Sequence, residues 1–269
     1  MIFENLILRS FLTGIFISIA YALLGIILVN KRMSFFADGI AHAILAGLAL
    51  GVLFNFSPII ISIITAILFS FLIRSIQQRT KLHTDALIGI IFTFGFSLGL
   101  VLLLLLPKYR GSLLDYLLGD ILTISILDFL LTFLALLIIS YLFFHYRKYI
   151  ILWLVNEDYF NLEVRKSQLF EIIFYIILGI MIVFGIKIGG VVLVSALMII
   201  PPSTARLISS SFKNYVLLSI FLSLIGFLIG FAISYYGNLP TGPTIVLAHS
   251  LLFFFAFLIF TVLSYNIKK

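Results

Sequence analysis

Long apolar runs, each about the length of a membrane-spanning helix, dominate this sequence. Nine of them are separated by short polar breaks, at residues 5–29, 34–54, 57–76, 85–106, 121–144, 168–187, 189–211, 214–236 and 243–264. A helix needs about 20 apolar residues to cross the hydrocarbon core of a bilayer. The pattern therefore predicts an all-α polytopic membrane protein with eight to nine transmembrane helices. No linker divides the chain, so we expect one membrane domain over residues 1–269.

The composition excludes the main soluble classes. Hydrophobic residues make up 63% of the 269 residues and charged residues only 10%, whereas a soluble domain carries about 25% charged residues. A soluble enzyme, a nucleic-acid-binding protein and a disordered chain are all incompatible with so little charge. The absence of Cys rules out disulfides and thiolate metal sites.

The positions of Lys and Arg predict the orientation in the membrane. If all nine runs cross, one side receives only Arg9, Lys108, Arg110 and Lys187, and the other receives the remaining thirteen of the 17 basic residues. Cytoplasmic loops are the ones that carry an excess of Lys and Arg. The N-terminus is therefore expected outside and the C-terminus in the cytoplasm.

Two ionisable residues stand inside the second apolar run. Asp38 and His42 are four residues apart, so they share one face of a helix. A carboxylate and an imidazole suit a divalent cation such as Zn²⁺ or Mn²⁺, and ionisable groups within a membrane usually line a site or a pathway. The alternative is that Asp38 caps the helix and His42 bonds a neighbouring carbonyl group.

Small residues recur beside this face, at Gly39, Ala43, Gly47 and Gly51. A stripe of small residues lets helices approach one another closely in a membrane. We therefore expect the second helix to be surrounded by other helices rather than by lipid.

Pro201 and Pro202 stand in the seventh run, 189–211. Two prolines remove two backbone donors and disrupt a helix, and broken helices at membrane depth often mark transport pathways. We expect a broken helix along a pathway here. The alternative is a simple proline kink.

The long polar break before the sixth run has an amphipathic pattern. Residues 156–166 alternate charged and apolar side chains, with Glu157, Asp158, Tyr159, Phe160 and Leu162 among them. The pattern predicts a short helix that lies in the lipid interface or docks into a groove of another protein. The apolar side that enters such a groove is expected to include Tyr159, Phe160 and Leu162.

Motifs of nucleotide hydrolysis and of hydrolytic catalysis are absent from the sequence. It contains no phosphate-binding loop, no H-E-x-x-H motif and no G-x-S-x-G motif. We predict that the chain is not an enzyme, and that any ATP hydrolysis takes place on a separate subunit.

Four stretches resemble one known family, the permease subunits of bacterial ABC importers for zinc, manganese and iron. They are RMSFFADGIAHA at 32–43, DALIGI at 85–90, GVVLVSALMIIP at 190–201 and PTGPTIVL at 240–247. They follow the family's order and their resemblance covers most of the chain. Two positions depart from the family's pattern: Ala41 replaces a Ser before His42, and Glu163-Val164 replace a Gly near the end of the helix in 156–166.

The resemblance implies a type II importer-like permease in the bacterial plasma membrane. It implies two cytoplasmic ATPase subunits, an extracytoplasmic metal-binding protein and a second permease copy as partners, besides membrane lipid and without nucleic acid. It places Asp38 and His42 on the path of a transported zinc or manganese ion, with no permanently bound cofactor. It also assigns residues 156–166 to the helix that couples the permease to the ATPase.

Three other functions stay open from the sequence. A permease for metal chelates such as haem, siderophores or cobalamin would need a wide path without metal ligands, which Asp38 and His42 argue against. An ion-coupled secondary transporter would need no ATPase. An intramembrane enzyme would need a nucleophile and a base, and no such set is visible.

Overall fold

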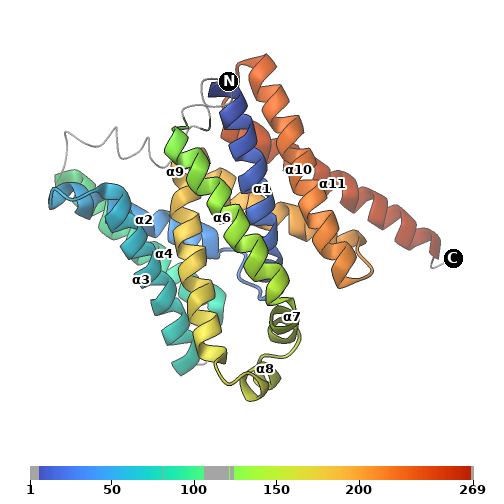
Figure 1. Ribbon diagram of the computed structural model, residues 1–269, viewed down its shortest axis with the longest axis horizontal. Coiled ribbons are helices and arrows are strands. Elements are labelled where there is room, and N and C mark those ends of the chain that lie inside the picture. The colour runs from blue at the N-terminus through green and yellow to red at the C-terminus, as the bar shows by residue number, and fades with distance from the viewer. Residues whose placement is uncertain (1–5, 81, 106–120, 122–123, 268–269) are drawn as a thin grey trace. The chain divides into compact units, whose positions relative to one another are not determined.

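The computed structural model describes residues 6–80, 82–105, 121 and 124–267, and within these residues the chain is helical without strands (Figure 1). The helices are α1 Leu6–Asn30, α2 Phe36–Leu53, α3 Pro58–Arg79, α4 Thr84–Leu105, α6 Ile126–His145, α7 Arg147–Val155, α8 Glu157–Glu163, α9 Ser167–Ile208, α10 Phe212–Gly237 and α11 Thr241–Ile267. Eight helices of the described part are long and apolar enough to cross a membrane. The predicted all-α membrane fold is confirmed. Lys108 and Arg110, which entered the orientation count, lie outside the described residues.

The helices form two compact units, each assembled from separated stretches of the chain. Unit 1 contains α1, α6, α10, α11 and α9 from Ser195 onward. In it α1 packs against α6 and α10, and α10 packs against α11. Unit 2 contains α2, α3, α4, α8, α7 from Lys148 and α9 up to Val194. In it α2 lies against both α3 and α4 (Figure 1).

Helix α9 contains two of the nine predicted segments. Its 42 residues correspond to about 63 Å of helix, roughly twice the thickness of the hydrocarbon core. The backbone leaves helical geometry at Gly190, with φ 81° and ψ 169°. Glycine adopts positive φ without the steric cost that a Cβ would bring. α9 therefore consists of two helical segments that meet at Gly190. It counts once among the eight helices and twice among the nine predicted segments.

The predicted break at Pro201 and Pro202 is wrong in position, because α9 stays helical through both prolines and departs from helical geometry at Gly190. Pro202 has no N–H to donate to the carbonyl of Met198, four residues earlier. That carbonyl faces Gly25 of α1, where a Cβ would overlap its oxygen. The close approach of a glycine backbone gives the carbonyl a neighbour in place of the missing donor.

Small residues hold α2 between its neighbours, as the sequence predicted. A Cβ on Gly39 would lie 2.6 Å from Ile88 of α4, and a Cβ on Gly47 would lie 2.6 Å from Thr65 of α3. Ala43 touches α4 in the same way, because Gly95 faces it. Close helix contacts of this kind replace the hydrophobic drive that lipid does not supply. They fix the helix that bears Asp38 and His42.

Candidate functional site

The two candidate ligands lie at the start of α2. Asp38 is in the first turn of the helix and His42 one turn later, and both are half-buried. The Nδ1 atom of His42 lies 3.0 Å from the backbone carbonyl oxygen of Asp38. The structure thus brings the two side chains to one face of one helix, as their spacing predicted. It also shows the carbonyl bond that the alternative for His42 required.

The bond to the carbonyl decides which nitrogen of His42 is available. A backbone carbonyl only accepts hydrogen bonds, so Nδ1 donates and carries the proton of the neutral ring. The lone pair is then on Nε2, the nitrogen that is left to bind a cation. A carbonyl or carboxylate partner on the other ring nitrogen is the usual way in which proteins orient a metal-binding histidine.

Two aromatic side chains of α4 fix the plane of the His42 ring. Phe92 and Phe96 are one helical turn apart and stack with centroids 5.8 Å apart at 7°. The His42 ring meets them edge-on, at 5.0 Å and 68° from Phe92 and at 5.5 Å and 75° from Phe96. This pair was not among the residues predicted from the sequence, where its signal was two Phe residues at helical spacing in an apolar run.

The ligand set of this face is small. Among the described residues, no group of three or more His, Cys, Asp or Glu side chains could enclose a metal ion. Asp38 and His42 belong to unit 2, whereas Pro201 and Pro202 belong to unit 1. Two side-chain ligands on one helix leave most of the coordination sphere of a cation open. Such an arrangement suits transient contact with an ion rather than permanent retention.

The predicted amphipathic helix is present as α8, which is shorter than residues 156–166 and ends at Glu163. Asn156 caps it by accepting a hydrogen bond from the backbone N–H of Tyr159 at 2.9 Å. Glu157 and Asp158 occupy the first turn, where negative charge complements the helix dipole. The preceding helix α7, Arg147–Val155, was not predicted as a separate element.

Phe160 does not project outward, contrary to the sequence-based expectation. Its side chain is fully buried and packs against Trp153 of α7 and Phe170 of α9, at centroid distances of 6.2 and 5.5 Å. A phenyl ring that finds aromatic neighbours in its own unit gains more from burial there than from exposure. Phe160 therefore anchors α8 to unit 2.

The outer side of α8 carries the other apolar residues. Leu162 is 84% exposed and Tyr159 is 49% exposed, and Val155, just before α8, is 80% exposed. The pKa of the Tyr159 phenol lies above its ordinary value, mainly because it is hydrogen-bonded to the Glu163 carboxylate. Tyr159 is thus a neutral side chain at physiological pH. We call the exposed apolar side chains Val155, Tyr159 and Leu162 together the α8 surface.

Comparisons with known proteins place this arrangement in a family. The ABC 3 transport family model matches residues 3–260. The zinc uptake membrane protein ZnuB of Haemophilus influenzae is 27% identical over 93% of this chain and 95% of its own length. The manganese transport membrane protein MntC of Listeria innocua is 27% identical over 93% of this chain and 89% of its own length.

A solved structure shares the fold. PsaBC from Streptococcus pneumoniae, determined in complex with a Fab, superimposes with a TM-score of 0.81 and 24% identity over 95% of this chain and 92% of the matched chain. The resemblance carried by the four sequence stretches is confirmed by the match over nearly the whole length. The chain is a multi-pass membrane protein that belongs to the ABC 3 transport family.

Proposed function

We propose that this chain is the membrane permease subunit of an ATP-driven importer that carries a divalent metal ion, zinc or manganese, into the bacterial cytoplasm. The observation that carries the proposal is the pair Asp38 and His42, with Nδ1 of His42 bonded to a backbone carbonyl. The relatives named for zinc and for manganese uptake support the same class of substrate. Both ions accept carboxylate and imidazole ligands.

The proposed role of the pair is transient coordination of the ion during passage. The Asp38 carboxylate supplies negative charge and the Nε2 atom of His42 supplies a lone pair. A pathway ligand has to bind the ion well enough to admit it and weakly enough to release it. Water and a second copy of the permease would supply the remaining ligands.

The proposed partners follow from the family and from what the sequence lacks. Without a phosphate-binding loop in this chain, a separate cytoplasmic ATPase hydrolyses ATP, and an extracytoplasmic protein delivers the metal. The α8 surface is the proposed contact with the ATPase, because its Leu162 and Val155 are strongly exposed on short helices between long apolar ones. This assignment puts α8 on the cytoplasmic side, and the C-terminus is on the same side when the two segments of α9 that meet at Gly190 each cross the membrane.

The metal proposal is tested with the permease reconstituted in liposomes together with its ATPase and binding protein. Asp38→Asn keeps the shape of the side chain and removes its charge, and His42→Leu removes the imidazole. Each variant should abolish uptake of the ion while expression and ATPase association stay intact. His83→Leu, at an exposed histidine before α4, is the matched control and should transport normally.

Competition among zinc, manganese and iron in the same uptake assay identifies the substrate. Near-normal uptake by both Asp38→Asn and His42→Leu would overturn the proposal, because Asp38 would then serve only the helix dipole and His42 only packing. ATP-driven uptake by the chain alone would overturn the assignment of ATP hydrolysis to another subunit.

The docking proposal is tested by placing a charge on the α8 surface. Leu162→Asp would bury a carboxylate in the contact, which costs several kcal/mol without a compensating partner. Co-purification of the ATPase should fall while the permease keeps its fold. Tyr236→Asp, at another side chain that is 84% exposed, is the control. Equal co-purification of the ATPase with wild type and Leu162→Asp would contradict this contact.

A further inference from the structure

The first turns of α9 present two neighbouring faces to the rest of unit 2. Phe170 and Phe174 are four residues apart and form one face, and Glu171 and Tyr175 form the next face in the same way. Because both faces belong to one short stretch of helix, a displacement of one is a displacement of the other.

The first face holds the segment that carries the α8 surface. Trp153 of α7 meets Phe170 and Phe174 edge-on, at centroid distances of 5.7 and 5.3 Å. Phe160 of α8 meets Phe170 at 5.5 Å. Trp153, Phe160 and Phe174 are buried and Phe170 is half-buried, so α7 and α8 are attached to α9 by packing as well as by the chain.

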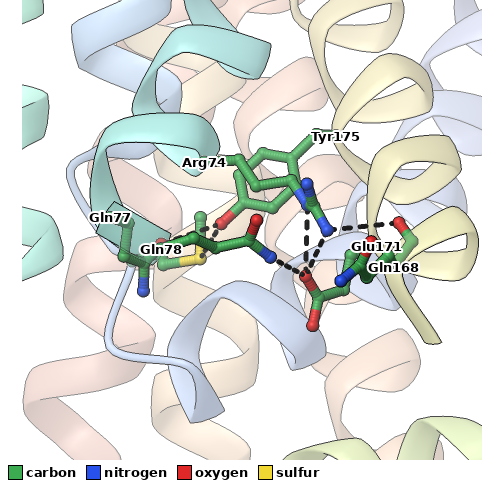
Figure 2. A network of polar contacts seen from close by, with 7 residues as sticks. Arg74, Gln77, Gln78, Gln168, Glu171 and Tyr175 are labelled. Carbon is green, nitrogen blue, oxygen red and sulfur yellow. Dashed lines mark hydrogen bonds and ion pairs between the residues drawn. The ribbon is translucent and has the colours of Figure 1, made fainter. Parts of the chain in front are cut away.

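The second face holds α3 through a buried ion pair, which Figure 2 shows in detail. The Nε and Nη2 atoms of Arg74 lie 3.1 and 3.0 Å from Oε2 of Glu171. Gln78 donates to the same oxygen at 3.2 Å, and Arg74 also donates to the backbone carbonyl of Gln168 at 3.3 Å. Three donors therefore converge on one carboxylate oxygen, and both charged side chains are almost inaccessible to solvent.

Tyr175 continues this face to the start of α2. Its hydroxyl lies 3.4 Å from Oε1 of Gln77 and 3.7 Å from Sδ of Met33, as Figure 2 shows for the tyrosine and the glutamine. Its ring packs against Phe36 at 5.6 Å. Met33 precedes α2 and Phe36 is its first residue. Tyr175 therefore contacts the N-terminal end of the helix that bears Asp38, which we call the entrance of α2.

Packing alone does not explain why this position holds charges. Burial in the last turns of α3 and the first turns of α9 removes both charges from water, at a desolvation cost that their attraction has to offset. A well-packed apolar pair of similar volume would be about as stable, or more stable. A network that binds α3, α9 and the entrance of α2 with directed bonds does, in contrast, fix their mutual geometry.

We propose that Tyr175 and the Arg74–Glu171 pair are positioning residues that transmit movement of the α8 surface to the metal-binding start of α2. Through Phe170 and Phe174, α9 follows α8, and through Glu171 and Tyr175 it carries α3 and the entrance of α2 with it. The inference rests on the proposed function, because it requires that the α8 surface receives the ATPase and that Asp38 and His42 receive the ion.

The test measures ions imported per ATP hydrolysed by the complete importer in liposomes. Tyr175→Phe removes the hydroxyl bonds and keeps the ring, and Arg74→Met combined with Glu171→Leu replaces the ion pair by apolar packing. Substitutions within coupling networks change coupling by about two- to thirtyfold. Both variants should lower the import ratio within this range, with thermal stability close to that of wild type and with ATPase association and metal binding unchanged. Tyr236→Phe, at an exposed tyrosine of α10, should keep the wild-type ratio.

The outcomes separate this inference from the proposed function. A wild-type ratio in both Tyr175→Phe and the double variant, with Asp38→Asn inactive, would overturn the positioning role and leave the metal permease standing. Normal uptake by Asp38→Asn would overturn the permease proposal itself. If the double variant fails to fold, Tyr175→Phe alone decides, because it removes no buried volume beyond one hydroxyl.

Discussion

Buried hydroxyls in both units of the molecule donate to carbonyls of their own helices, and the contrast between the units lies in a few groups with distant partners. In unit 1 the hydroxyls of Ser18 and Ser219 donate to backbone carbonyls of their own helices, each at 2.7 Å. His249 likewise meets only backbone carbonyls, those of Ile245 at 2.8 Å and Ser223 at 3.1 Å. In unit 2 the buried groups include a full ion pair between α3 and α9.

The contrast distinguishes positions that need only a small side chain from positions that need one specific partner. A serine satisfied by the carbonyl four residues earlier needs no other part of the chain, so it can occupy any position that demands a small side chain. A buried charge needs a partner of opposite sign, and Arg74 finds one 97 residues further along the chain. We therefore expect the Arg74–Glu171 site of unit 2 to be sensitive to removal of one charge, and the backbone-bonded His249 site of unit 1 to be sensitive to added volume.

The largest effect is expected from removing one charge of the pair. Arg74→Met leaves Glu171 buried without its cation, and breaking a buried pair in this way costs about 3–5 kcal/mol. The double variant Arg74→Met with Glu171→Leu should restore most of the loss. The measurement is the free energy of unfolding in detergent micelles. Equal losses in the single and double variants would show that the site depends on volume rather than charge.

A smaller effect is expected from added volume in unit 1. A Cβ on Gly226 would lie 2.5 Å from Nε2 of His249, whose ring is held on both sides by carbonyls. Gly226→Ala should lower the free energy of unfolding by about 1–3 kcal/mol, the usual cost of overpacking. Gly89→Ala is the control, because no heavy atom lies within 4 Å of its Cβ position. A loss as large in Gly89→Ala would mean that steric conflict is not the cause.

Features that depend on local spacing could be predicted from the sequence. The period of the helix puts Asp38 with His42 on one face and Gly39 with Ala43 and Gly47 on the neighbouring one. Structure confirms the close helix contacts of these small residues. The nine apolar runs gave the helical class and most helix boundaries, since each run is bounded by polar residues.

Features that depend on distant partners could not be predicted. Phe160 faces inward because Trp153 and Phe170 surround it, and nothing within α8 distinguishes it from the exposed Leu162. α9 runs through Pro202, and the carbonyl of Met198 that is freed there faces Gly25 of α1, which is far away in the sequence. Arg74 and Glu171 lie near the ends of two apolar runs, where charges are common, so their sequence positions did not indicate the network of Figure 2.

The smallest effects sharpen the comparison within unit 1. Ser223 donates to the carbonyl of Ser18 on α1 at 2.9 Å, whereas Ser219 bonds within α10. Hydrogen bonds between membrane helices contribute about 0.6 kcal/mol on average. Ser223→Ala should therefore lower the free energy of unfolding by about that amount. Ser219→Ala should have a smaller effect still, because its carbonyl partner already accepts a bond in the helix.

Both serines are fully buried, so the pair is matched in exposure and in the volume removed. A loss above about 2 kcal/mol in either variant would exceed what such bonds contribute. Unit 1 would then depend on directed polar contacts as strongly as unit 2 does, and the distinction between the two units would fail.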